Sequence, residues 1–314
     1  SVVPVDVVKS IDELACQLDE GQRQDPEGLS ARIKAGIAEN IGPHITCSIG
    51  FAANRHLAKI ACAIDKPNGL TIWHPADMPS PLLAVPMDDI PGVGNRMKVR
   101  LGTARIFSTE DLYNTQPKQL RSVTGERLWY ALHGYSITAL PTERGMYGHA
   151  RVLPPDQRGI DDAEQIARLL LTKAARRMRR AGFYCAGLWL WLRFYEGGWS
   201  IQHKLPVVHD DKALLSALSA LWADMKRGRS SRTRVLRVGV TLFDLSPAGQ
   251  RQLDWLENDD HDRQRWERIG TAIDGLNSHY AATVVSIGPW APPQGGNVGG
   301  KISFTRIPSA EDFW

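Results

Sequence analysis

The chain has 314 residues, of which 43% are hydrophobic and 23% charged, with a formal net charge of +4. This composition is typical of a globular protein long enough for two or three domains. No segment has the apolar length of a membrane span and the start does not resemble a signal peptide, so a cytoplasmic protein without a membrane partner is expected. The four cysteines have no metal-ligand spacing and are expected to be reduced, buried thiols.

The first predicted element is a strand over residues 5–13 that ends in two adjacent carboxylates, Asp12 and Glu13. Its β-branched valines suit a pleated strand. Paired carboxylates at a strand end are one way to hold a divalent metal. An acidic pair taken alone is more often a solvated loop feature, because a short motif is only a hypothesis until its context agrees.

With the elements that follow it, this strand makes a predicted β-α-β-α unit. A helix begins at Asp25 and ends near Gly42, a strand ends at Gly50, and a second helix covers residues 54–64. Lys59 on that second helix is expected to face water. The turn that follows, residues 66–69, places Lys66 before Pro-Asn-Gly, where a lysine is by default solvated.

Residues 81–134 are predicted to be helical and broken by prolines. Within them, the sequence Ile-Pro-Gly-Val-Gly at residues 90–94 is a hairpin of the helix-hairpin-helix kind. Gly92 and Gly94 would let backbone N–H groups at a helix start approach a phosphate closely. Such a contact positions DNA without reading its sequence. The alternative is a plain glycine-rich connection between helices.

From residue 148 the pattern changes to strand-helix-strand-strand-helix-strand. The strands are predicted at 149–153, 186–194, 199–207 and 235–242, and the helices at 161–180 and 214–222. Two basic runs, residues 176–180 and 226–234, favour a polyanionic partner. Four arginines of the second run are predicted to contact phosphates with salt-dependent affinity: Arg227, Arg229, Arg232 and Arg234. The alternative is a solvated charged face.

A polar stretch beyond residue 246 contains the apolar segment Gln252-Leu253-Asp254-Trp255-Leu256. It is interpreted either as a short helix packed on the core or as a linear anchor for an apolar groove.

Four motifs occur in order along the first third of the chain. They are Ser-Ile-Asp-Glu at 10–13, Ser-Ile-Gly at 48–50 with Asn54 and Ala-Lys-Ile-Ala at 58–61, Lys-Pro-Asn-Gly at 66–69, and Ile-Pro-Gly-Val-Gly at 90–94. In this order the chain resembles the Y-family (translesion) DNA polymerases, with UmuC-like bacterial members closest. The resemblance runs over nearly the whole chain and implies an α+β multidomain fold. The implied parts are a partial polymerase palm (1–80), a helical thumb (81–147), a little-finger DNA-binding domain (148–245) and a C-terminal tail (246–314).

The resemblance implies an error-prone nucleotidyltransferase that acts in DNA damage tolerance and the SOS response. Its two-metal mechanism would use Mg²⁺, which prefers hard oxygen ligands, held by Asp12 and Glu13. Lys66 would contact the triphosphate of the dNTP, and primer-template DNA would be the second substrate. Residues 252–256 resemble a bacterial sliding-clamp peptide, with Trp-Leu in place of Leu-Phe, whose contacts would be Gln252, Leu253, Trp255 and Leu256. A UmuD-like subunit or a recombinase filament is a further partner that the resemblance suggests.

In the family, a third carboxylate and a fingers domain precede the Ser-Ile-Asp-Glu motif. Asp6 is not expected to replace that carboxylate, because six residues of strand rising about 3.3 Å each span roughly 20 Å. An N-terminally incomplete polymerase is therefore expected, which binds primer-template DNA but extends it poorly. One alternative is a non-catalytic homologue that keeps DNA and clamp binding. An unrelated helix-hairpin-helix module would explain Gly92 and Gly94 but not the other motifs.

Overall fold

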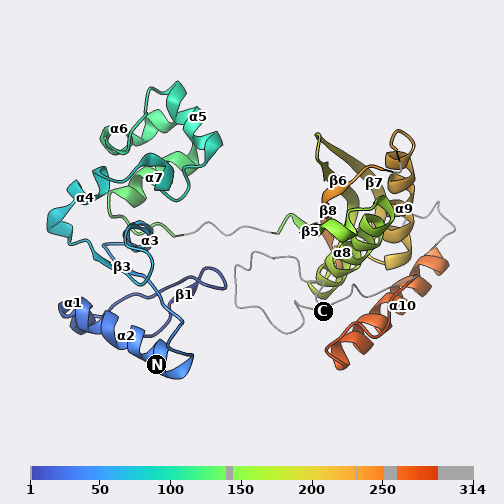
Figure 1. Cartoon of the computed structure of the whole chain (residues 1–314), viewed down its shortest axis with the longest axis horizontal. Coiled ribbons are helices and arrows are strands. Elements are labelled where there is room, and N and C mark those ends of the chain that lie inside the picture. The colour runs from blue at the N-terminus through green and yellow to red at the C-terminus, as the bar shows by residue number, and fades with distance from the viewer. Residues whose placement is uncertain (1, 139–143, 231, 251–259, 289–314) are drawn as a thin grey trace. The chain divides into compact units, whose positions relative to one another are not determined.

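The computed structural model describes residues 2–138, 144–230, 232–250 and 260–288. The chain forms two compact units, residues 1–141 and 142–314 (Figure 1). Both units contain helices and strands, which confirms the predicted α+β fold class. Among the described residues, no helix combines the length and the apolar character needed to cross a membrane.

The first unit begins with a hairpin where a single strand was predicted. Strand β1 (Val7–Val8) pairs antiparallel with β2 (Leu14–Ala15), and the Lys9 N–H donates to the Glu13 carbonyl at 2.8 Å. The strand predicted over 5–13 is therefore wrong, because the chain turns where the Ser10 side chain bonds to Asp12. The separation of roughly 20 Å expected between Asp6 and Asp12 assumed a straight strand of six residues, so it does not apply to this hairpin.

Two helices and a parallel strand pair follow. Helix α1 (Glu20–Gln24) precedes α2 (Pro26–Asn40), which Asp25 caps by accepting the Gly28 N–H at 2.8 Å. Strands β3 (Ile49–Phe51) and β4 (Leu70–Ile72) are parallel and are joined through α3 (Arg55–Ile64). The predicted helix that begins at Asp25 and the strand near Gly50 are thus confirmed. The predicted helix 54–64 is also present and begins one residue later, at Arg55.

Gly50 lets α3 lie directly on the backbone of β3. A Cβ atom at this position would stand 2.1 Å from the Ala58 carbonyl oxygen and 2.4 Å from the Cys62 nitrogen. Both atoms belong to the helix backbone, which cannot move aside as a flexible side chain could.

Replacing Gly50 by alanine is expected to destabilise the first unit by about 3 kcal/mol, because the methyl group has no space without displacing α3. Gly102→Ala is the control, since its Cβ would lie 3.6 Å from Phe107, an ordinary contact, and alanine favours a helix. Urea unfolding of the two variants measures the difference. Equal stability of both variants would contradict this packing.

The rest of the first unit is helical, as predicted. Its elements are η1 (Pro75–Asp77), α4 (Ser80–Leu83), η2 (Met87–Asp89), α5 (Asn95–Thr103), α6 (Thr109–Asn114), η3 (Pro117–Leu120) and α7 (Val123–Leu132). One core contains Leu57 and Ile60 of α3 together with Leu112, Leu120 and Leu128 of this helical part. The residues predicted as palm and thumb therefore share a core.

Asn54 joins the two parts of this core by hydrogen bonds. Its Oδ1 accepts the Leu57 N–H at 2.9 Å and so caps α3, while its Nδ2 donates to the carbonyls of Ala131 and Tyr135 at 2.7 and 2.9 Å. The side chain is buried, and its contacts satisfy carbonyls at the end of α7. Asn54 therefore links helices α3 and α7 by hydrogen bonds in addition to their shared core.

The second unit confirms the predicted β-α-β-β-α-β order. Its elements are β5 (Met146–Val152), η4 (Pro155–Gln157), α8 (Ile160–Arg180), β6 (Phe183–Phe194), β7 (Gly198–Val208), α9 (Asp211–Lys226), β8 (Val235–Pro247) and η5 (Ala248–Gln250). The sheet is antiparallel with the order β5-β8-β6-β7. Helices α8 and α9 cover one face, where Leu188, Leu190 and Leu192 enter the core (Figure 1).

A further helix, α10 (Asp260–His279), packs on this unit through buried ion pairs. Arg179 of α8 donates to Asp274 of α10 at 2.7 Å and to Asp211 of α9 at 2.7 Å, and only 7% of its side chain is exposed. The basic run 176–180 was predicted to favour a polyanion, but Arg179 and Arg176 are used inside the protein, since Arg176 also lies 3.5 Å from Asp274. The segment 252–256, with Gln252, Leu253, Trp255 and Leu256, lies outside the described residues.

The cysteines are free, and their burial is uneven. Cys185 is buried on β6, and burial raises the pKa of its thiol to about 12. Cys16, Cys47 and Cys62 are only half-buried, so the expectation of four buried thiols is wrong for these three.

His149 on β5 makes the stability of the second unit depend on pH. Burial, reinforced by Lys173 and Arg177, lowers the pKa of His149 from 6.5 to about 4. The unfolded chain therefore binds the proton first, and the free energy of unfolding falls as the pH drops from 6.5 to 4, by about 3 kcal/mol.

His149→Gln is expected to flatten this part of the pH profile, whereas His203→Gln, at an exposed position on β7, is expected to leave it unchanged. Denaturant unfolding at several pH values measures both profiles. His209, whose pKa is also lowered by burial, remains in both variants and contributes to the residual slope, as does Asp211, whose pKa burial raises.

Candidate active site and nucleic-acid interface

Asp12 lies in the turn between β1 and β2 and is exposed. Its Oδ1 accepts the Ser10 hydroxyl at 2.5 Å. This bond, with smaller contributions from the Asp12 amide and the ammonium groups of Lys66 and Lys59, holds the pKa of Asp12 below its usual value against a weaker effect of desolvation. The carboxylate is therefore ionised at neutral pH and presents hard oxygen donors to solvent.

Glu13 is held by Lys59 of α3. The Lys59 ammonium donates to Oε1 and Oε2 of Glu13 at 2.8 and 2.6 Å, and both side chains are partly exposed. The interpretation of Lys59 as a residue that only faces water is thus wrong. The pairing was missed because the two residues are far apart in the sequence and meet only when α3 packs near the hairpin.

The turn that carries Lys66 has a constrained backbone. Asn68 adopts a left-handed conformation with φ of 60°, and a Cβ on Gly69 would stand 1.8 Å from the Asp65 carbonyl oxygen. The Ser48 hydroxyl accepts the Gly69 N–H and donates to the Asp65 carbonyl, each at 3.2 Å. These contacts close the turn, and the charge of Lys66 acts on Asp12. The structure therefore pairs Glu13 with Lys59 and places the charges of Lys59 and Lys66 within electrostatic range of Asp12.

The fit of this site to Mg²⁺ is partial. Asp12 offers ionised, exposed oxygens, which are the ligands that Mg²⁺ prefers. Glu13 becomes a ligand only when it leaves Lys59. Among the residues that the structure describes, no group of three or more His, Cys, Asp or Glu side chains is placed to hold a metal. Asp6, the nearest acidic residue earlier in the chain, instead lies 4.0 Å from Arg55.

The glycine turn before α5 has the shape expected of a phosphate contact. Gly92 has a φ of +97°, which other residues rarely adopt, and the Val93 N–H closes the turn on the Ile90 carbonyl at 3.0 Å. No atom lies within 4 Å of a Cβ position on Gly92 or Gly94. No side chain caps α5, and the N–H groups at an uncapped helix start can bind an anion.

The four predicted arginines of the second unit differ in their surroundings. Arg227 forms an ion pair with Asp224, and the Arg229 guanidinium lies over the Phe194 ring at 4.0 Å. Arg232 and Arg234 are exposed. The last two are thus better placed for phosphates than the first two, whose charges have partners within the protein.

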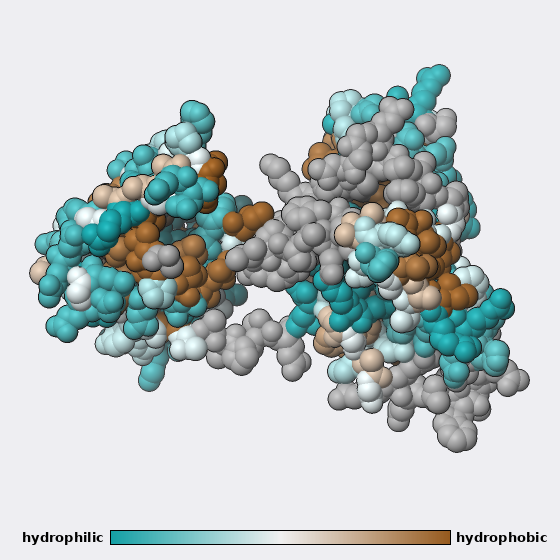
Figure 2. Space-filling view, turned by 90° about the horizontal axis from the view of Figure 1, so that it is seen from below, coloured by the Kyte–Doolittle hydropathy of each residue, from teal (hydrophilic) through white to brown (hydrophobic). Residues whose placement is uncertain are grey.

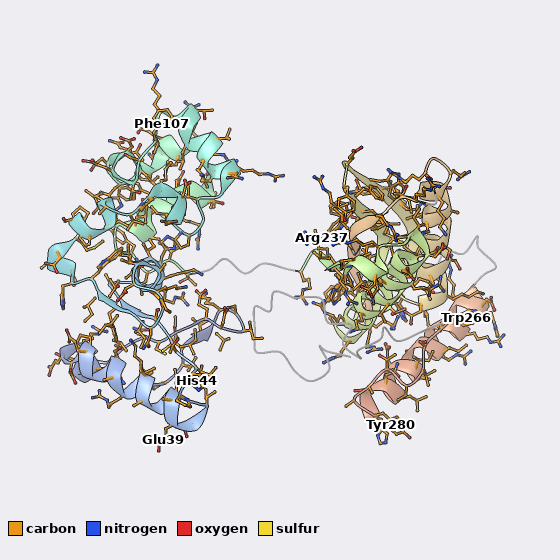
Figure 3. The ribbon with its side chains drawn as sticks, in the orientation of Figure 1. Glu39, His44, Phe107, Arg237, Trp266 and Tyr280 are labelled. Atoms are coloured by element: carbon orange, nitrogen blue, oxygen red, sulfur yellow. The ribbon has the colours of Figure 1, made fainter. Side chains whose placement is uncertain are left out.

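The residues of the sheet face turned away from α8 and α9, here named the outer sheet face, were not identified from the sequence. Strand pairing aligns its residues in four rows: Val152, Arg237, Arg193, Gly198; Ala150, Gly239, Trp191, Ser200; Gly148, Thr241, Trp189, Gln202; and Met146, Phe243, Gly187, Lys204. Every charged residue in these rows is basic. Arg237, labelled in Figure 3, lies over the Trp191 ring at 5.0 Å.

Two glycines allow aromatic rings to lie flat on the outer sheet face. A Cβ on Gly239 would meet the Trp191 indole at 2.2 Å, and one on Gly187 would meet the Phe243 ring at 2.4 Å. A flat sheet with three basic residues, Arg193, Lys204 and Arg237, suits a polyanion. The Leu-Trp-Leu-Trp-Leu alternation at 188–192 was the available signal, but only the strand register shows which basic residues share the face with the tryptophans.

The first unit combines carboxylates beside lysines with a glycine turn, and the second unit has a basic sheet face. This combination is typical of multidomain proteins that process DNA. Comparison with known proteins supports this class. The impB/mucB/samB family matches residues 3–63, and the C-terminal domain of the same family matches residues 144–255. The chain belongs to the Y-family DNA polymerases.

Curated relatives and a solved structure agree with this assignment. DNA polymerase IV of Moorella thermoacetica is 28% identical over 271 residues, which cover 83% of this chain and 65% of that protein. DNA polymerase IV of Citrobacter koseri is 30% identical, covering 67% of this chain and 60% of that protein. A Y-family DNA polymerase chimera of Dbh and Dpo4 shares the fold with a TM-score of 0.56 at 22% identity, over 76% of this chain and 71% of that one. The chain thus spans about 65% of the length of the first curated relatives.

Proposed function

We propose that this chain is part of an error-prone translesion DNA polymerase that acts in DNA damage tolerance and the SOS response in the cytoplasm. The observation that carries the proposal is the meeting of Asp12, Glu13, Lys59 and Lys66 in one unit. Two carboxylates beside two ammonium groups match a substrate that combines Mg²⁺ with a triphosphate. Because the chain spans only about 65% of the length of its curated relatives, the activity is proposed for the whole protein to which these residues belong.

In this site each residue has a distinct task in nucleotidyl transfer. Bound Mg²⁺ would activate the primer 3′-hydroxyl and neutralise the pyrophosphate leaving group. Asp12 would hold the metal through oxygens that stay ionised at neutral pH. Lys66 would bind the triphosphate oxygens of the dNTP. Lys59, whose Nζ lies 2.6 Å from Oε2 of Glu13, would neutralise the charge of that carboxylate when no metal is bound to it.

Primer-template DNA would be bound by both units. The turn at Gly92 and Gly94 would contact one phosphate through backbone N–H groups. The outer sheet face, with Arg232 and Arg234 in the loop before β8, would lie against duplex phosphates. Residues 252–256 are proposed to bind the β sliding clamp, and a UmuD-like subunit or a recombinase filament is proposed as a further partner.

The double variant Arg193→Gln, Arg237→Gln is expected to weaken duplex DNA binding and to reduce the slope of log affinity against log salt by about 2. Lys212→Gln is the control, since this lysine sits on α9 and is paired with Asp262. Fluorescence anisotropy at several salt concentrations gives both slopes. An unchanged slope in the double variant would exclude the outer sheet face as a phosphate contact.

The test of the proposed activity is primer extension on a primed template with and without Mg²⁺. It uses the longest natural protein that contains these 314 residues, beside the chain alone. Mg²⁺-dependent extension by the longer protein is expected, and weak or undetectable extension by the chain alone. Tight primer-template binding without extension in either protein would replace the proposal by a non-catalytic, DNA- and clamp-binding accessory function, which the Glu13–Lys59 ion pair would then explain.

A further inference from the structure

Lys34 of α2 contacts the turn that carries Lys66. Its ammonium donates to the Asn68 carbonyl at 2.5 Å and to the Gly69 carbonyl at 3.1 Å. The two carbonyls follow one another, so a single charge holds the end of the turn. Because α2 lies outside the strand-helix-strand segment that includes this turn, the contact joins two separate parts of the first unit.

The contact with Lys34 differs from the other contacts that shape the turn. Ser48, which directly precedes β3, bonds to Asp65 and Gly69. Gly69 has no side chain, so its backbone can approach the Asp65 carbonyl closely. Lys34 instead binds the side of the turn where Asn68 has its left-handed conformation. Asn68 is exposed, so water can replace the ammonium at its carbonyl, and the carbonyl of the buried Gly69 still accepts the Ile49 N–H at 3.1 Å. Loss of Lys34 is therefore expected to loosen the turn more than it destabilises the fold.

We propose that Lys34 is a positioning residue for nucleotide binding. By holding the carbonyls of Asn68 and Gly69 it fixes the backbone from which Lys66 extends, and so sets where the Lys66 ammonium meets a triphosphate. This inference rests on the proposed function, because it assumes that Lys66 binds the triphosphate of a nucleotide. Lys34 itself would not touch the substrate.

The test compares nucleotide affinity in four variants of the full chain: Lys34→Met, Lys34→Arg, Lys66→Ala and Arg32→Ala. The probes are dATP with Mg²⁺, inorganic triphosphate and dAMP, measured by calorimetry. Lys34→Met is expected to weaken dATP and triphosphate binding about tenfold, the value of one charge-assisted hydrogen bond. Binding of dAMP is expected to change little. Lys34→Arg, which keeps donors for both carbonyls, is expected to restore much of the affinity.

Arg32→Ala is the matched control, because Arg32 is on the same helix, is exposed and pairs with Asp25 at 3.5 Å. It is expected to leave affinity unchanged. Amide hydrogen exchange over residues 65–70, measured without nucleotide, is expected to be faster in Lys34→Met and unchanged in Arg32→Ala. A purely structural role would lower the melting temperature of Lys34→Met without a difference between dATP and dAMP.

The outcomes separate this inference from the proposed function. Weaker triphosphate binding in Lys66→Ala but not in Lys34→Met would overturn the positioning role alone. No triphosphate binding by the wild-type chain, or equal binding by Lys66→Ala, would overturn the nucleotide site and the positioning role with it. Unchanged hydrogen exchange in Lys34→Met would also overturn the positioning role.

Discussion

Replacing Asp12 by alanine is expected to lower primer extension by at least about a hundredfold, while primer-template binding stays near the wild-type value. Asp12 is an exposed carboxylate whose pKa is held low, first of all by the Ser10 hydroxyl, so it is ionised at neutral pH. Loss of residues that only support metal ligands already costs ten- to a hundredfold, and loss of a ligand itself costs more. Extension is measured on the longer natural protein and DNA binding by anisotropy.

Asp6→Asn is the control for this prediction. Asp6 belongs to the same hairpin, but its carboxylate lies beside Arg55 rather than beside Lys59 and Lys66. Extension close to wild type is expected in this variant. Extension that survives in Asp12→Ala would contradict the placement of the metal at this turn.

Replacing Arg179 by methionine is expected to lower the free energy of unfolding of the second unit by about 3–5 kcal/mol. The substitution keeps most of the side-chain volume but removes the guanidinium that pairs with the buried carboxylate of Asp211, whereas Asp274 keeps its contact with Arg176 at 3.5 Å. Burial raises the pKa of Asp211, and the charge of Arg179 acts in the opposite direction. Without the arginine, Asp211 is expected to take up a proton at higher pH.

Lys212→Met is the matched control, because Lys212 also joins α9 to α10 but through an exposed pair with Asp262 at 3.2 Å. Exposed pairs contribute at most about 1 kcal/mol. Denaturant unfolding followed by tryptophan fluorescence compares the two variants. A loss of less than 1 kcal/mol in Arg179→Met would show that the buried network adds little to the docking of α10.

The elements of the second unit could be predicted from the sequence because their hydrophobic periods are long and regular. The 21 residues of α8 and the 12 residues of β6 both carry clear patterns. The opening hairpin could not be predicted, because a few hydrogen bonds of Lys9 and Ser10 to Asp12 and Glu13 turn a short segment that is rich in β-branched residues. A hydrophobic pattern identifies a long helix or strand, but it does not show where a two-residue strand ends and the chain turns.

The candidate site was predicted in its residue types but not in its partners. Asp12, Glu13 and Lys66 were found from ordered motifs, and the structure brings them together with Lys59. The Lys59 pairing, the contacts of Lys34 and the rows of the outer sheet face depend on residues distant in sequence. Such contacts follow from how helices and strands pack, which a single sequence does not contain.

The hydrogen bonds of Asn54 fix the spacing between two parts of the first unit. Its side chain fastens the start of α3 to the end of α7, and α7 shares its core with the turn around Gly92. A helix carrying Lys59 and a turn suited to a DNA phosphate therefore move together. With the DNA and nucleotide contacts proposed above, the protein would fix the distance between a bound backbone phosphate and the triphosphate, whatever bases the DNA contains.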